Sequence, residues 1–132
     1  MADTLITGTS LVETKTRLDV KPTDTSSEFD FTLTDLTTDG TWRSLDISGI
    51  VPEGTQWIIL RVWVKDDAAD SAIHLNGDGQ ENGANTVLAN TQVANITKAP
   101  QHWVKIAPGR LLYYKADNLT WTEIQLKVQG WL

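Results

Sequence analysis

Residues 76–82 place an oxygen-bearing side chain at every second position, as a cation-binding loop would. The four side chains belong to Asn76, Asp78, Gln80 and Asn82. A calcium loop of the EF-hand type requires acids at its first, third and fifth positions, glycine at the sixth and a bidentate glutamate at the twelfth. Counted from Asn76, the sixth position is Glu81, the twelfth is Val87, and Asp78 supplies the single charge among the alternating residues. The pattern therefore favours a polar loop between strands over a metal site.

Other residues with catalytic or metal-binding chemistry are few and scattered. Calcium would be held at the loop only if Asp66, Asp67 or Asp70 folded over it. There is no cysteine, which excludes disulfides and thiolate chemistry. His74 and His102 have no partner at the spacing of zinc ligands, and no G-x-S-x-G turn presents a nucleophilic serine. We expect no catalytic residue, no metal, no cofactor and no enzymatic activity.

Six tryptophans in 132 residues are the strongest sign of a recognition surface. Trp57 and Trp63 share one face of a predicted strand with Arg61, because side chains alternate along a strand. Trp121 and Trp131 are expected on the polar face of the last strand, at its two ends. Tryptophan often fills the core of a β-sandwich, where it buries a large area, and two further roles fit these five residues. They could form an interface with another protomer, where aromatic residues and arginine act as anchors, or they could stack on the rings of a carbohydrate.

Length and composition indicate one domain of an ordinary globular kind, with 40% hydrophobic and 21% charged residues. The start "MADTLITGTS" has neither a basic nor an apolar region of a secretory signal, and runs such as "WIIL" are too short to cross a membrane. The formal charge is −6, without a basic cluster for a phosphate backbone. We therefore expect synthesis in a cytoplasm and no nucleic-acid or membrane partner.

The chain beyond residue 41 alternates short strand patterns with turn signals, and no comparable window has helical periodicity. This pattern predicts an all-β fold, an antiparallel β-sandwich of jelly-roll type. The segments 102–106 and 111–116, joined by "APGR", are expected to pair as a hairpin, since proline and glycine suit a tight turn. The other predicted strands are 41–48, 56–65, 71–75 and 121–132, with residues 85–96 either a strand or an irregular crossing.

Residues 1–40 differ in kind from the rest of the chain. They contain eleven threonines, no tryptophan, and eight acids against three bases. We expect residues 1–25 to form an extended N-terminal arm and residues 26–132 to form the sandwich.

Two runs in the sandwich segment, "WRSLDISGIVPEGTQWIILRVWVKDDAADSAIHLNG" and "LLYYKADNLTWTEIQLKVQGWL", resemble a β-sandwich module of tailed-bacteriophage virion proteins. The shared elements are the opening from Leu45 to Gly54, an apolar strand with Arg61 in its middle, and an end at Gly130-Trp131. The resemblance covers roughly residues 41–132. Within phage virions, such modules resemble small capsid decoration (cement) proteins or receptor-facing modules of the tail.

The short chain, its own methionine and the arm favour the decoration protein. The resemblance then implies a non-enzymatic structural protein, made in the host bacterial cytoplasm and located on the capsid surface. Its partners would be the major capsid protein and itself, as a homotrimer. The Trp57/Arg61/Trp63 face would pack against a neighbouring protomer. The alternative is a tail-associated module that binds host-surface carbohydrate with Trp57, Trp63, Trp121 and Trp131. The arm residues expected to contact the capsid are Thr4, Leu5, Ile6, Leu11, Val12, Arg17, Leu18 and Val20.

Overall fold

The computed structural model describes residues 19–20, 28–81 and 83–132. Most of the predicted arm, including the capsid-contact residues from Thr4 to Leu18, lies outside these ranges. Val20 falls within the described residues, in a two-residue strand.

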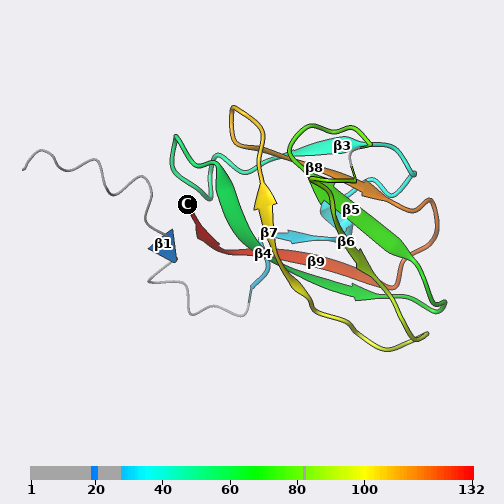
Figure 1. Cartoon of the computed structure of the whole chain (residues 1–132). Helices are drawn as coiled ribbons and strands as arrows, with labels where there is room; N and C mark the ends of the chain where they lie inside the picture. The colour runs from blue at the N-terminus through cyan, green and yellow to red at the C-terminus, as the bar shows by residue number, and fades with distance from the viewer. Residues whose placement is uncertain (1–18, 21–27, 82) are drawn as a thin grey trace, which may run out of the picture.

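The described chain is an all-β sandwich of two antiparallel sheets, which confirms the predicted fold class (Figure 1). In the first sheet, sheet A, the strands run in the order β1-β9-β4-β7, and β2 also pairs with β9. Their bounds are β1 (Asp19–Val20), β2 (Phe31–Thr32), β4 (Trp57–Lys65), β7 (Gln101–Lys105) and β9 (Glu123–Trp131). In the second sheet, sheet B, the order is β3-β8-β5-β6. Their bounds are β3 (Arg43–Asp46), β5 (Ala72–Asn76), β6 (Val87–Asn90) and β8 (Leu111–Ala116). A short 3-10 helix, η2 (Leu33–Asp35), follows β2.

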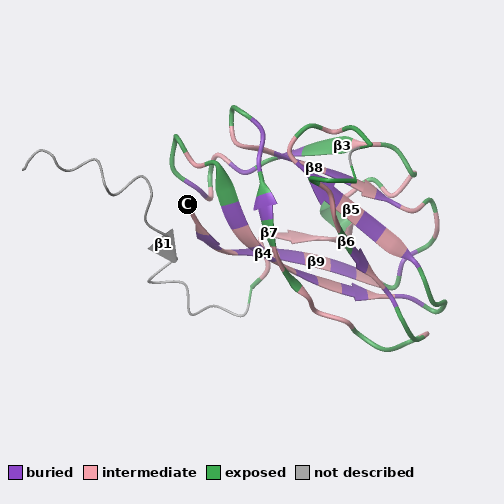
Figure 2. Ribbon diagram, in the orientation of Figure 1, coloured by how far each residue is buried: buried purple, intermediate pink, exposed green. Residues whose placement is uncertain are grey.

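The core lies between the two sheets and follows from the alternation of side chains along each strand (Figure 2). In β4 every second residue is fully buried, and the residues between them are more accessible. Strand β9 repeats the pattern beside it, and β5 and β8 bury the facing side chains of sheet B. Each buried aliphatic side chain contributes about 1.5–3 kcal/mol relative to exposure. The fully buried aliphatic residues of β4 are Ile58, Leu60, Val62 and Val64.

The predicted hairpin between 102–106 and 111–116 is wrong, although its turn forms. The amide of Arg110 donates to the carbonyl of Ala107 at 3.2 Å, and Gly109 has a φ of 80°, as the Pro-Gly sequence favours. However, β7 pairs with β4 in sheet A, whereas β8 pairs with β3 and β5 in sheet B. The turn carries the chain from one layer to the other, because both strands must bury an apolar face in the same core.

A β-bulge near the end of β9 changes which face its last residues occupy. Ile59 pairs with Gly130, but Leu60 pairs with Val128, so Gln129 is the extra residue. Beyond the bulge, Trp131 pairs with Ile58, which faces the core. Strict alternation placed Trp131 on the polar face, and the structure corrects this: Trp131 packs against the core.

Strand β1 joins sheet A at the same end of β9, where Asp19 pairs with Trp131 and Val20 pairs with Gly130. The chain ends close to this point (Figure 1). Residues 19–20 therefore belong to the pairing of the sheet, although they precede the predicted arm boundary at residue 25.

Candidate binding surface

The outer face of sheet A is the surface of β4, β7 and β9 that points away from the core. The register places its side chains next to one another across the three strands. Four of the residues are basic and one, Glu123, is acidic, although the whole chain has a net charge of −6. Its members are Trp57, Ile59, Arg61, Trp63, Lys65, Gln101, Trp103, Lys105, Glu123, Gln125 and Lys127.

At one end of this face, Trp63 is held in place by two neighbours. The ring of Phe29 meets it edge-on, with centroids 4.7 Å apart and planes at 73°. The guanidinium carbon of Arg61 lies 5.5 Å from the centre of the Trp63 ring, a cation–π contact. Arg61 is itself fixed, because its Nε donates to the carbonyl of Ala99 at 3.1 Å. Phe29, Arg61 and Trp63 therefore form a rigid strip of aromatic and cationic side chains at this end of the face.

At the other end, two tryptophans are exposed side by side. Trp57 pairs with Lys105 and Ile59 pairs with Trp103, so the two indoles are diagonal neighbours on adjacent strands. Their exposed fractions are 36% and 49%. Together with Lys105 and residues 84–87 they surround a hollow of about 120 Å³.

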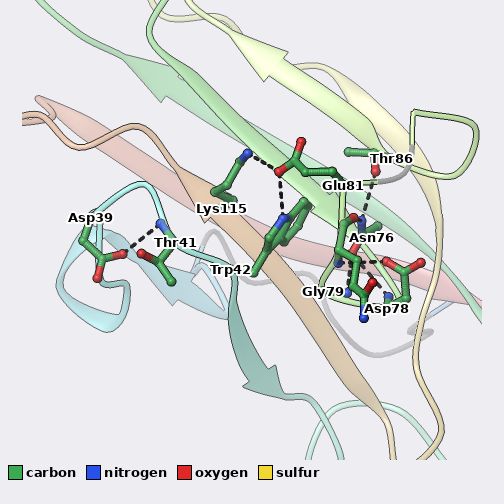
Figure 3. A network of polar contacts seen from close by, with 10 residues as sticks. Asp39, Thr41, Trp42, Asn76, Asp78, Gly79, Glu81, Thr86 and Lys115 are labelled. Carbon is green, nitrogen blue, oxygen red and sulfur yellow. Dashed lines mark hydrogen bonds and ion pairs between the residues drawn. The ribbon is translucent and has the colours of Figure 1, made fainter.

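The loop between β5 and β6 forms one wall of that hollow, and buried Asn76 organises it (Figure 3). The Asn76 side-chain nitrogen donates to the carbonyl of Gln80 at 2.8 Å and to the Thr86 hydroxyl at 2.9 Å. The Asn76 side-chain oxygen accepts from the amides of Asp78 and Gly79 at 3.3 and 2.9 Å. One side chain thus ties the beginning of the loop to its end.

Glu81 fastens the middle of the loop to the outer face of sheet B. Its Oε2 accepts a hydrogen bond from the Trp42 indole nitrogen at 2.9 Å and forms an ion pair with Lys115 (Figure 3). The Lys115 ammonium also lies 5.5 Å from the centre of the Trp42 ring. The Lys115 hydrogen bond, followed by that of Trp42, lowers the pKa of Glu81 from its ordinary value. Glu81 therefore remains charged and anchoring at neutral pH.

Of the alternating residues that suggested a metal loop, Asn82 lies outside the described residues, and oxygens of the other three are engaged in hydrogen bonds within the loop. Asn76 and Asp78 each accept hydrogen bonds from the loop's own amides, and the Gln80 carbonyl accepts one from Asn76. Asp66, Asp67 and Asp70 all precede β5 while this loop follows it, so a strand of about 16 Å separates them from the loop. Across residues 28–81 and 83–132, no three His, Asp or Glu side chains are grouped to hold a metal.

The two histidines lie in different sheets and share no site. His74 is on the outer face of sheet B, opposite Lys115 of β8 and Leu88 of β6. His102 pairs with Leu60 and faces the core side of sheet A. Burial lowers the pKa of His102 below its usual value of 6.5, despite a hydrogen bond with the Leu88 backbone that acts the other way.

The structure separates the tryptophans that the sequence grouped. Trp121 precedes β9, is only 5% exposed, and donates from its indole nitrogen to the Asp117 carbonyl at 3.1 Å. With Trp131 on the core side, the predicted polar face carrying both residues does not form. Trp57, Arg61 and Trp63 do share one face, as predicted.

Trp103 is the residue of this surface that sequence reasoning missed. Alternation in the run "QHWVK" does separate Trp103 and Lys105 from Val104, which is buried. The signal was insufficient because the partner of β7 was taken to be β8, so nothing placed Trp103 beside Trp57.

No helix in the described ranges is long and apolar enough to span a membrane. No family model matches the chain, and no curated protein sequence matches it.

Proposed function

We propose that the protein is a structural component of a tailed-phage virion that binds the assembled capsid and stabilises it, without enzymatic activity. The observation that carries this proposal is the outer face of sheet A, which is aromatic and cationic on an otherwise acidic chain. The resemblance of residues 41–132 to phage sandwich modules supports it.

The composition of this face suits a protein–protein contact. Interfaces are enriched in tryptophan and arginine, and such side chains lose less entropy on binding when they are already held in place. Arg61 and Trp63 meet this condition, because Phe29 and the Ala99 carbonyl restrict both of them before a partner arrives. Little side-chain entropy is then lost on binding.

The position of β1 supports a contribution from the N-terminal arm. Because β1 pairs with the end of β9, the arm joins the sandwich at the edge of sheet A. The arm and the outer face of sheet A could then engage the capsid lattice together. In the proposed homotrimer, the Arg61–Trp63 strip contacts the neighbouring protomer, while the arm and the basic residues beside the strip, Lys65 and Lys127, contact the major capsid protein.

Co-sedimentation with purified capsids that lack this protein tests the proposal. Four proteins are compared: the full chain, a chain without residues 2–16 that keeps β1, and the full-length variants Arg61→Glu and Arg43→Glu. Arg43 is a matched control, because it is an exposed arginine in sheet B, paired with Asp39. Arg61→Glu and the deletion should reduce binding at least tenfold, while Arg43→Glu binds like the parent. Equal binding by all four would refute the roles given to the arm and to this face.

A further inference from the structure

The hollow at the β7 end of the outer face of sheet A has the features of a small ligand site. It lies beside the edge strand β7 and opens to solvent. Its volume of about 120 Å³ is below the roughly 300–1,000 Å³ of pockets that enclose drug-sized ligands. A single six-membered ring can therefore sit in it, with the rest of a larger ligand outside. The lining residues are Trp57, Ala84, Asn85, Thr86, Val87, Trp103 and Lys105.

The two indoles provide an apolar floor. Trp57 and Trp103 are large hydrophobic side chains that remain 36% and 49% exposed, although burying them would be favourable. They are diagonal neighbours on an antiparallel pair, at about 7–8 Å. The C–H face of a pyranose ring is flat and apolar and can stack on such a surface, while its hydroxyls point outward to polar groups.

The rim supplies polar groups of defined chemistry. Asn85 is exposed and offers an amide with both a donor and an acceptor. Lys105 is exposed beside Trp57, and no carboxylate of the described residues lies within ion-pairing distance of its ammonium. A cation at the rim of an aromatic floor favours a ring that carries a carboxylate over a neutral ring.

The wall of the hollow is already formed without a ligand. Asn76 closes the loop that carries Asn85, and Glu81 ties that loop to Trp42 and Lys115. Gly77 packs the start of the loop closely against the backbone of Lys105. A preformed wall reduces the entropy lost when the ligand binds. This is important for a ligand that contacts the protein through a single ring.

We propose that this hollow binds one acidic sugar residue of a glycan, with the ring on Trp57 and Trp103 and the carboxylate at Lys105. The proposal goes beyond capsid binding and does not depend on it. It differs from the four-tryptophan platform expected from the sequence, because Trp63, Trp121 and Trp131 take no part and Trp103 joins Trp57. A single-ring site should bind weakly, with a Kd on the order of 1 mM.

The test is titration of the full chain with glucuronate, followed by NMR shifts of the tryptophan indole N–H groups. Glucose serves as the neutral sugar. The variants are Trp103→Ala and Lys105→Ala, and Lys65→Ala is the matched control for the lysine because it lies on the same face at the far end of β4. Trp103 is half exposed, so its replacement should leave the fold intact, which the NMR spectrum itself reports.

The expected result is saturable binding of glucuronate that weakens at least tenfold in Trp103→Ala. Lys105→Ala should weaken glucuronate binding several-fold and leave glucose binding unchanged, and Lys65→Ala should change neither. No shift up to about 50 mM glucuronate, far above a millimolar Kd, would overturn the proposal. Binding of glucose as tightly as glucuronate would also overturn it. So would a loss of capsid binding in Trp103→Ala when the parent protein binds no sugar. The last outcome would assign the hollow to a protein contact. Capsid sedimentation remains a separate readout, so either proposal can fail alone.

Discussion

Gly77 lies so close to Lys105 that a Cβ atom on Gly77 would be 2.4 Å from the Lys105 carbonyl oxygen. It would also lie 3.0 Å from the carbonyl carbon of Ile106. The neighbours are backbone atoms of the end of β7 and the residue after it, so they cannot rotate away. This contact joins the loop after β5, in sheet B, to sheet A, and only glycine permits it.

Replacing Gly77 with alanine should therefore displace the loop or the end of β7. We expect a loss of about 1–3 kcal/mol in the free energy of unfolding, as for other overpacked sites, measured by urea denaturation. Gly83→Ala is the control, because a Cβ at Gly83 meets nothing within 4 Å. Equal stability of the two variants would show that the loop does not press on β7. If the hollow binds a sugar, Gly77→Ala should also weaken that binding, and Gly83→Ala should not.

The contacts of Glu81 with Lys115 and Trp42 should be lost at acid pH. The folded-state pKa of Glu81 is lowered from its usual value of 4.5 by Lys115 and Trp42. Its contribution is therefore complete above pH 4.5 and is lost as the pH falls through the lowered value. The indole N–H resonance of Trp42 should shift in that range, because its acceptor becomes protonated. In Glu81→Gln the shift should be absent, and a titration of Trp42 that persists in this variant would contradict the assignment.

His102 should make stability depend on pH in the mildly acidic range. Because burial lowers its pKa in the folded state, the unfolded chain binds more protons once the pH falls below about 6.5. Stability is then greatest above this value and decreases as the pH falls through the folded-state pKa. Thermal melts between about pH 8 and pH 5.5 should show a declining Tm for the parent. His102→Gln should have a flatter profile, and an unchanged slope would exclude His102 as the cause.

Trp121 and Trp57 should respond differently to the same substitution. Trp121 is 5% exposed within the core, so Trp121→Ala should cost about 3–5 kcal/mol of stability. Trp57 is 36% exposed, and Trp57→Ala should lower stability by less, about 1–2 kcal/mol. Chemical denaturation of both variants measures the difference. Similar losses of stability at the two positions would contradict the placement of Trp121 in the core and of Trp57 on the surface.

Local pattern predicted the strands better than it predicted their partners. The alternation in 56–65 and 121–132 correctly indicated β4 and β9 with one buried face each, because burial acts on every second residue regardless of the neighbouring strand. The same alternation could not predict the partners of the segments 102–106 and 111–116, which do not pair with each other. A Pro-Gly turn determines the local path of the chain, but whether the strands after it stay in one sheet depends on the rest of the core.

The binding surface was only partly predictable for the same reason. Trp57, Arg61 and Trp63 lie on one strand, so periodicity alone placed them together. Trp131 was misplaced because Gln129 is an extra residue in β9, and a bulge leaves no distinct pattern in the run "KVQGW". Trp103 reaches Trp57 through strand pairing between segments far apart in the chain. The predicted arm contacts from Thr4 to Leu18 remain a prediction.

Binding of the full chain to purified capsids that lack it is the most direct test of the proposed function. The amount of protein that sediments with capsids is measured against protein concentration, at low and at high salt. We predict saturable binding that weakens as salt rises, because the outer face of sheet A is cationic and salt screens its charges. Protein that stays in the supernatant at every concentration in low salt would contradict the proposal.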